Sequence, residues 1–287
     1  MRTIMVATDF SERSDRALRR AVMLAKETGA ALVLVHAIDD DQPYEILEAK
    51  KEKVEGLLAR MSATLKSGDG LACAYHVVFG SPFAKLAQAT VDHKADLLVL
   101  GPHRRQILRD IFVGTTAERT IRSVQCPVLM TNAAAAGSYR RVVFATDLSD
   151  PSREAIEAAK ALGIAGHAIS SLLYVFDAPT LRLAMSHTLA KDKKEHILLD
   201  ESVEAARQLA EFATSLNAED VEQLVRHDEM TPAVEILAAA EEISADLIVV
   251  GTHGRRGVAR LLLGSVAEEI LRRADRDVLA VPPKAAE

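Results

Sequence analysis

The chain has 287 residues, of which 49% are hydrophobic and 26% charged, and its net charge is −6 at pH 7. This composition is typical of a soluble globular protein, and no apolar run approaches the ~20 residues that a membrane span requires. The acidic balance and the 4% aromatic content disfavour a nucleic-acid partner, which would need a basic surface or stacking side chains. We therefore expect neither a membrane nor a nucleic-acid partner.

The first residues lead directly into a strand-length apolar run, Thr3 to Ala7. They lack the longer apolar region and the cleavage site of a secretory leader, so we expect a cytoplasmic protein. Two cysteines, Cys73 and Cys126, are too few for a disulfide framework. We interpret them as small buried hydrophobic residues.

Short apolar runs alternate with stretches of helical spacing along the whole chain. Such runs are typical of parallel strands that are buried on both faces and joined by crossover helices. The predicted strands of the first half are residues 3–7, 31–37, 74–78, 97–100 and 128–130. Those of the second half are residues 142–145, 170–175, 222–225, 247–250 and 278–281. We expect Ser11 to cap the first helix and Ser149 or Asp150 to begin its counterpart.

The two halves are copies of one another, which predicts a duplicated architecture. The segment from Ile4 to Ser11 matches the segment from Val142 to Ser149 at an offset of 138 residues. Later matches lie at an offset of 150: Pro82 with Pro232, Gly101 with Gly251, and Gly114 with Gly264. The second copy therefore carries twelve extra residues between Asp177 and Pro232, and we place them around residues 179–197.

A stretch of small residues at 132–138 separates the copies, and we place the boundary at Gly137. This predicts two domains, residues 1–137 and 138–287, each of a common domain size. The first has 18 basic and 16 acidic side chains, and the second has 17 and 25.

The predicted fold class is α/β, with two tandem, doubly wound, open, parallel five-stranded sheets that carry helices on both faces. The last strand of each sheet would leave unpaired backbone groups at an edge. We expect residues 128–130 to pair with residues 279–281, so that the halves form an internal pseudo-dimer. A further homodimer of two chains stays open.

The most specific motif follows the fourth strand of the second half, where Gly251, Gly254, Gly264 and Ser265 have the spacing G-x2-G-x9-G-S. A strand that ends in glycines and resumes as a helix places backbone N–H groups where a phosphate can sit. Asp147 and Val175 end the first and second strands of the same half. Because the carboxyl ends of parallel strands share one edge, these segments are expected to converge on one crevice, as a nucleotide site needs.

With these motifs the chain resembles the universal stress protein family in its tandem form, over nearly its whole length. The glycine motif carries the resemblance, supported by Thr146-Asp147-x-Ser149, by residues 245–251 and by Cys126-Pro127-Val128. The family resemblance implies an ATP-type ligand in the second half, with Mg²⁺ left open. It also implies a stress-response protein that acts as a nucleotide-dependent regulatory or protective binding module, with a protein partner of unknown identity.

The resemblance further implies that Asp147 lies near the adenine or the ribose, and that His253 can reach the ribose or a phosphate. Gly251 and Gly254 would let the backbone approach the phosphates closely, and Gly264, Ser265 and Val266 would offer N–H groups. The expected nucleotide-binding residues are Ala145, Asp147, Val175, Val250, Gly251, His253, Gly254, Gly264, Ser265 and Val266. Met230, which we align with Gly80, is expected to narrow the crevice.

The equivalent positions of the first half are Asp9, Ala37, Gly101, Arg104, Gly114 and Thr115. Arg104 replaces the second glycine of the motif, and we expect its side chain to close this site. The alternative is that its guanidinium binds an anion other than ATP. The nearby Arg105 and Arg109 keep this alternative open.

Less specific interpretations apply to the same residues. Glycines at strand ends often serve only as turns, and Asp147 could simply cap a helix. His36 and His253 have no partner at metal-ligand spacing, so we expect no metal site. Neither a Walker motif nor a nucleophile elbow is present, so we expect a binding protein rather than an enzyme. A slow ATPase, and a nucleotide-independent scaffold or sensor for an acyl or lipid-like ligand, remain alternatives.

Overall fold

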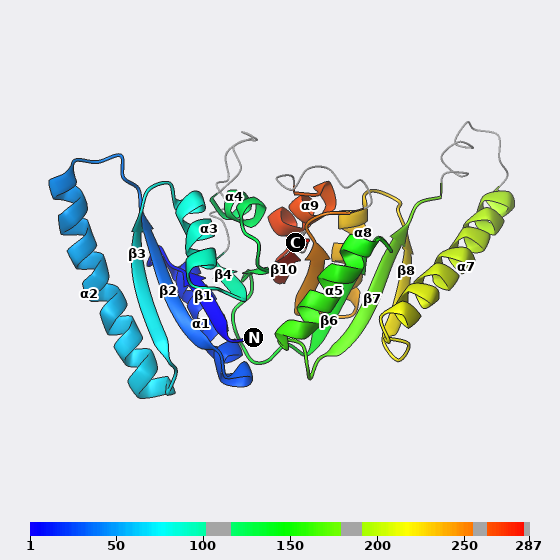
Figure 1. Cartoon of the computed structure of the whole chain (residues 1–287). Coiled ribbons are helices and arrows are strands. Elements are labelled where there is room, and N and C mark those ends of the chain that lie inside the picture. The colour runs from blue at the N-terminus through cyan, green and yellow to red at the C-terminus, as the bar shows by residue number, and fades with distance from the viewer. Residues whose placement is uncertain (102–115, 179–190, 255–262, 284–287) are drawn as a thin grey trace.

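The computed structural model describes residues 1–101, 116–178, 191–254 and 263–283, and it shows two α/β halves side by side (Figure 1). In these residues ten strands form one sheet in the order β3-β2-β1-β4-β5-β10-β9-β6-β7-β8. The strands are β1 (Thr3–Ala7), β2 (Ala31–Ile38), β3 (Cys73–Phe79), β4 (Leu97–Leu100), β5 (Val128–Met130), β6 (Arg141–Thr146), β7 (Ile169–Phe176), β8 (Glu222–His227), β9 (Leu247–Gly251) and β10 (Asp277–Val281). Each predicted strand agrees with an observed one to within two residues at either end.

Eight helices in the described ranges cover the two faces of this sheet. They are α1 (Glu12–Thr28), α2 (Tyr44–Asp69), α3 (Pro82–Asp92), α4 (Thr116–Ser123), α5 (Asp150–Leu162), α7 (Lys191–Ser215), α8 (Pro232–Glu242) and α9 (Ser265–Arg273). Buried side chains of α1, α2, α5 and α7 form the core on one face, and those of α3, α4, α8 and α9 form the core on the other. The predicted doubly wound α/β fold is confirmed.

The helices begin where the sequence predicts. Ser11 caps α1 and Ser149 caps α5, and each hydroxyl accepts a hydrogen bond from the N–H three residues later. Apolar residues recur on one side of α1, and Ala17, Ala21 and Leu24 are buried there against the sheet. Such burial of an apolar stripe supplies most of the stability of an amphipathic helix.

The halves join through their last strands, as expected. Within each half the strands are parallel, whereas β5 and β10 are antiparallel, with Leu129 opposite Leu279. Both leucines are fully buried. The join therefore continues the sheet and both cores from one half into the other, which confirms the internal pseudo-dimer. None of the described helices has a segment both long and apolar enough to cross a membrane.

The strand register locates the extra residues of the second half. Ile38 lies opposite Phe79, and the equivalent Phe176 lies opposite His227. The offset between the halves is therefore 148 at His227 and reaches 150 only at Pro232. Ten extra residues thus precede the end of β8 and two follow it, whereas the sequence suggested one insertion around residues 179–197. Residues 179–190 lie outside the described ranges.

This register also corrects the expectation for Met230. The Gly80 N–H donates a hydrogen bond to the Ile38 carbonyl, and the Asp228 N–H donates to the equivalent Phe176 carbonyl, both at 2.9 Å. Asp228, not Met230, therefore stands in the place of Gly80. Met230 is 74% exposed and does not narrow the crevice.

Candidate functional site

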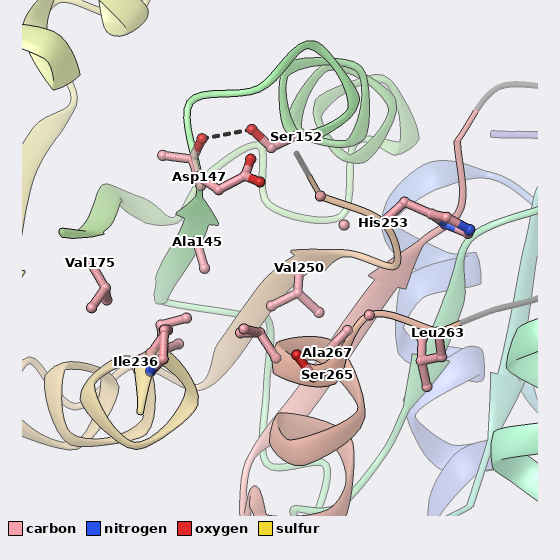
Figure 2. A pocket seen from close by; sticks show the side chains of 16 residues that line it. Ala145, Asp147, Ser152, Val175, Ile236, Val250, His253, Leu263, Ser265 and Ala267 are labelled. Carbon is pink, nitrogen blue, oxygen red and sulfur yellow. Dashed lines mark hydrogen bonds between the residues drawn. The ribbon is translucent and has the colours of Figure 1, made fainter. Parts of the chain in front are cut away.

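A cavity of about 510 Å³ opens at the carboxyl ends of β6 and β9, where the strand order of the second half reverses (Figure 2). Ligands of open α/β sheets bind at such reversal points. The described lining residues are Ala145, Thr146, Asp147, Ser152, Val175, Pro232, Ile236, Val250, Gly251, His253, Gly254, Leu263, Gly264, Ser265, Val266 and Ala267. The structure thus brings all ten expected residues around one space.

Asp147 occupies a tight turn between β6 and α5. Leu148 has a left-handed backbone, with φ of 64°, which is uncommon for a residue other than glycine. The Thr146 hydroxyl holds this turn, because it accepts the Leu148 N–H at 2.9 Å and bonds to the Ser152 hydroxyl at 2.7 Å (Figure 2). Asp147 Oδ1 accepts the Ser149 N–H at 3.1 Å and the Ser149 hydroxyl at 2.5 Å.

The same turn recurs in the first half. Phe10 has φ of 59°, Thr8 Oγ1 accepts its N–H at 3.1 Å, and Asp9 Oδ1 accepts the Ser11 N–H at 3.0 Å. Burial favours the neutral form of Asp9, but hydrogen bonds with Ser11 and Ser14 and the charge of Arg13 together outweigh burial and hold the Asp9 pKa below its ordinary value. One carboxylate oxygen thus holds the turn before the helix in both halves, whereas the helices themselves are capped by Ser11 and Ser149.

The other carboxylate oxygen of Asp147 lies against Gly254. A Cβ atom at position 254 would sit 2.7 Å from Asp147 Oδ2, well inside van der Waals contact. The second glycine of the motif therefore leaves room for the Asp147 carboxylate beside the cavity. Arg104 stands at the equivalent position of the first half. The two halves therefore differ at the residue whose size decides where the aspartate carboxylate of the turn can lie.

The N-terminus of α9 supplies the hydrogen-bond donors of the cavity. The first three N–H groups of a helix have no partner within the helix, and here they belong to Ser265, Val266 and Ala267. None of these three N–H groups donates a hydrogen bond within the described part of the chain. All three residues line the cavity, and a helix N-terminus favours negative charge.

Gly264 differs from the expectation. Its N–H donates to the Thr252 carbonyl at 2.8 Å, so it is not available to a ligand. A Cβ atom there would approach the same carbonyl to 3.2 Å. Gly264 thus fixes the turn before α9, and Ala267, which we did not predict, provides the third donor. The helix start at Ser265 is the signal that could have identified it.

Gly251 also has a packing role. A Cβ atom at this position would lie 3.2 Å from the His253 carbonyl oxygen and 3.4 Å from Ala155 Cβ on α5. At Gly101, a Cβ atom would lie only 2.6 Å from the Arg13 carbonyl oxygen of α1. The glycine that ends the fourth strand therefore allows the first helix of each half to pack closely, in addition to bordering the cavity.

The His253 side chain is held by its neighbour. Its Nδ1 lies 2.9 Å from the Thr252 hydroxyl, and its Nε2 is buried without a hydrogen-bond partner among the described residues. Figure 2 shows the ring directed away from Ala145 and Val175. The ring thus lies away from the apolar end of the cavity.

The apolar end of the cavity lies between β6, β7 and α8. Ala145, Val175, Val250 and Ile236 present aliphatic side chains toward one another (Figure 2). Ile236 and Pro232 were not predicted, because the repeat aligns α8 with α3 without showing which side of the helix faces the ligand edge. Among the described lining residues, Asp147 is the only carboxylate, and none is a lysine or an arginine.

A second cavity, of about 400 Å³, occupies the equivalent place in the first half. Asp9, Ala37 and Gly101 line it, together with Arg13 and His36. Arg13 NH2 lies 3.7 Å from Asp9 Oδ2, and burial holds the pKa of His36 below its ordinary value. Arg104, Arg105, Arg109, Gly114 and Thr115 lie outside the described ranges, so the expected closure by Arg104 stays a prediction.

Other candidate chemistry is sparse. In the ranges that the structure describes, the one group of three possible metal-ligating side chains within reach of each other is the exposed Asp39–Asp41 stretch of the first half. Both cysteines are free; Cys73 is buried, and burial raises the pKa of Cys126 to about 11. A thiol with so high a pKa is a poor nucleophile.

Comparison with known proteins gives a consistent result. The model of the universal stress protein family matches the chain twice, over residues 1–132 and 138–282. A universal stress protein of Methanocaldococcus jannaschii is 34% identical over 144 residues, which cover 50% of this chain and 82% of that protein. One of Mycolicibacterium smegmatis is 25% identical over 300 residues, covering 98% and 97%. The crystal structure of one from Archaeoglobus fulgidus superposes with a TM-score of 0.69 at 22% identity, covering 98% of each chain.

Proposed function

The chain belongs to the universal stress protein family and carries two tandem copies of its domain, and from this premise we propose that the cavity of the second half binds ATP. The observation that carries the proposal is the arrangement of three N–H groups, of Ser265, Val266 and Ala267, which have no partner among the described residues, around the same space as the Asp147 carboxylate and an aliphatic end. A volume of about 510 Å³ lies within the usual range for small-molecule sites.

The residues present fit an adenine nucleotide in three parts. The phosphates would take the N–H groups at the start of α9, because this helix end carries a partial positive charge. Asp147 would accept hydrogen bonds from the ribose hydroxyls, since Gly254 leaves its Oδ2 room beside the cavity. The base would pack among Ala145, Val175 and Ile236. Val250, Gly251, His253 and Gly264 would shape the space between these parts.

We propose a binding role rather than catalysis. The described lining holds one carboxylate and one histidine, and this histidine bonds to Thr252, so within the described lining no side chain is placed as an activated nucleophile. Bound ATP would stabilise the Asp147 turn and the start of α9, and a protein partner would distinguish this state from the empty one. We place this activity in the cytoplasm, in a stress response, with residues 138–287 as the nucleotide-binding domain and residues 1–137 as its altered copy.

Isothermal titration of ATP into nucleotide-free protein tests the proposal. The wild type should bind about one ATP per chain, and Gly254→Arg should bind none, because the new side chain would displace the Asp147 carboxylate. Gly166→Arg is the matched control, since it adds the same side chain to the same half at an exposed glycine whose Cβ would have no neighbour closer than 3.6 Å. Absence of ATP binding to the wild type would refute the proposal.

A second candidate follows from the aliphatic end of the cavity and from the single carboxylate of its lining. These features also suit an uncharged or acyl-type ligand that needs no phosphate donors. Mass spectrometry of small molecules released from the purified protein distinguishes the two candidates. Recovery of acyl compounds without adenine nucleotides would favour a nucleotide-independent sensor.

A further inference from the structure

A buried polar cluster, outside both cavities, connects the two halves. Asp277 at the start of β10 is 0% exposed, Tyr139 is 3% exposed, and Arg20 on α1 is 5% exposed. Asp277 Oδ2 accepts hydrogen bonds from Arg20 Nε at 3.0 Å and from the Tyr139 hydroxyl at 2.6 Å. The Arg20 guanidinium also lies over the Tyr139 ring, 4.3 Å from its centroid.

The segment between the halves completes this cluster. Asp277 Oδ1 accepts the Ala133 N–H at 3.0 Å, and Arg20 NH1 donates to the Gly137 carbonyl at 2.6 Å. Both carboxylate oxygens are therefore satisfied, and the arginine has a charged and a neutral acceptor. A buried ion pair needs such complete pairing, because removing either partner leaves an uncompensated charge in a medium of low polarity.

The cluster lies on one side of the pseudo-twofold axis only. The antiparallel pairing places this axis at Leu129 and Leu279, so the equivalent of Asp277 is Pro127. The equivalent of Arg20 is Ala158, because α1 and α5 align at their caps Ser11 and Ser149. The other side of the axis thus has an alanine and a proline where this side has the ion pair.

The strands at the join do not themselves discriminate between partners. The paired residues of β5 and β10, 128–130 and 278–280, are apolar and buried, and each strand pairs through a central leucine. Either strand could therefore pair with its own copy from a second chain. In a β5–β5 pair, however, each Arg20 would face Pro127 of the other chain, and in a β10–β10 pair each Asp277 would face Ala158 of the other chain.

From this asymmetry we infer that the Arg20–Asp277–Tyr139 cluster selects the pairing partner, favouring the first half with the second half over either half with its own copy. Pairing of two copies of the same half, one from each of two chains, would leave two buried charges unpaired. The observed pairing of the first half with the second leaves none. The cluster thereby keeps the two dissimilar cavities within one structural unit. This inference does not depend on which ligand the cavities bind.

The test replaces the whole cluster with apolar residues, as Arg20→Leu, Tyr139→Phe and Asp277→Leu together. Apolar replacement of a complete buried ion pair is often tolerated, so the variant should keep a cooperative unfolding transition. Light scattering after size exclusion should show a dimer fraction at least tenfold above that of the wild type at equal concentration. A dimer fraction equal to that of the wild type in a folded variant would overturn the inference.

Three further variants make the result specific. When Leu129→Cys is added to the triple variant, oxidation should give a disulfide-linked dimer, because residue 129 faces its own copy only in a β5–β5 pair. The triple variant without Leu129→Cys is the control. Pro127→Asp in the otherwise unchanged chain retains the native cluster and gives Arg20 a partner in a β5–β5 pair, so it should also raise the dimer fraction. If Pro127→Asp leaves the dimer fraction unchanged, the inference fails even where the triple variant does not fold.

Arg122→Ala with Glu268→Ala removes a more exposed ion pair between the halves. This double variant should leave the dimer fraction unchanged.

Discussion

The N–H group of Ser265 can be removed without disturbing the helix that carries it. Ser265→Pro places proline at the first position of α9, where a helix tolerates it. The Ser265 N–H donates no hydrogen bond within the described part of the chain. The residue before a proline must be extended, and Gly264 already has φ of −61° and ψ of 143°. We expect the free energy of unfolding to stay the same or to rise by up to about 1 kcal/mol, because proline restricts the unfolded chain.

The effect on ATP binding follows from the hydrogen bond that is removed. A hydrogen bond from a backbone N–H to a charged acceptor contributes about 1.5–3 kcal/mol. Since each 1.4 kcal/mol changes a dissociation constant tenfold, Ser265→Pro should weaken ATP binding by roughly 10- to 100-fold. Adenosine, which has no phosphate, should bind the variant and the wild type equally.

Isothermal titration with ATP and adenosine checks this prediction, and denaturant unfolding monitors stability. Ser265→Ala is the control, because it keeps the N–H and removes only the hydroxyl. It separates loss of the backbone donor from loss of the side chain. Equal ATP affinity in Ser265→Pro and Ser265→Ala, with both proteins folded, would refute the placement of the phosphates at the start of α9.

Three further predictions concern the Thr-Asp-x-Ser turn, the glycine after the fourth strand and a half-buried histidine. Thr146→Val removes the acceptor of the Leu148 N–H, so it should lower the free energy of unfolding by about 1–3 kcal/mol and weaken ATP binding. Thr8→Val, the equivalent change in the first half, should cost similar stability and leave ATP affinity unchanged. Equal ATP affinities in the two variants would count against the role of the Asp147 turn. Gly101→Ala should lower the free energy of unfolding by about 1–3 kcal/mol, because its Cβ would lie 2.6 Å from the Arg13 carbonyl oxygen, while Gly166→Ala should change it little in urea titrations. Burial lowers the pKa of His36 below 6.5, so the unfolded chain binds the proton more tightly, and the free energy of unfolding should fall as the pH drops below about 6.5. His36→Gln should reduce the dependence of stability on pH in this range. An unchanged dependence would contradict the prediction.

The fold could be predicted because its determinants are local and periodic. Buried parallel strands appear as continuous apolar runs, and the duplication showed each run twice. The switch-point rule then brought Asp147, Val175 and Gly251 to one edge without any knowledge of side-chain contacts. The pairing of β5 with β10 followed from the need to satisfy an exposed edge.

The features that could not be predicted depend on contacts between distant segments. The Arg20–Asp277–Tyr139 cluster joins residues separated by 257 positions at its extremes, and no spacing rule connects them. The place of Met230 depends on strand register, since the two residues added after β8 shift the alignment without changing any motif. The role of Gly264 depends on a single hydrogen bond to Thr252, which the sequence gives no means to assign.

The duplicated chain also separates what the glycine motif does for the fold from what it would do for a ligand. Gly101 and Gly251 both allow the first helix of their half to pack against the end of the fourth strand, so this glycine would be needed in a half that binds nothing. The Thr-Asp-x-Ser turn likewise has the same hydrogen bonds in both halves. Gly254 differs, because its missing side chain makes room for a carboxylate oxygen of Asp147 and its first-half equivalent is Arg104. Position 254, rather than the motif as a whole, is therefore where a change should abolish binding and leave the fold intact.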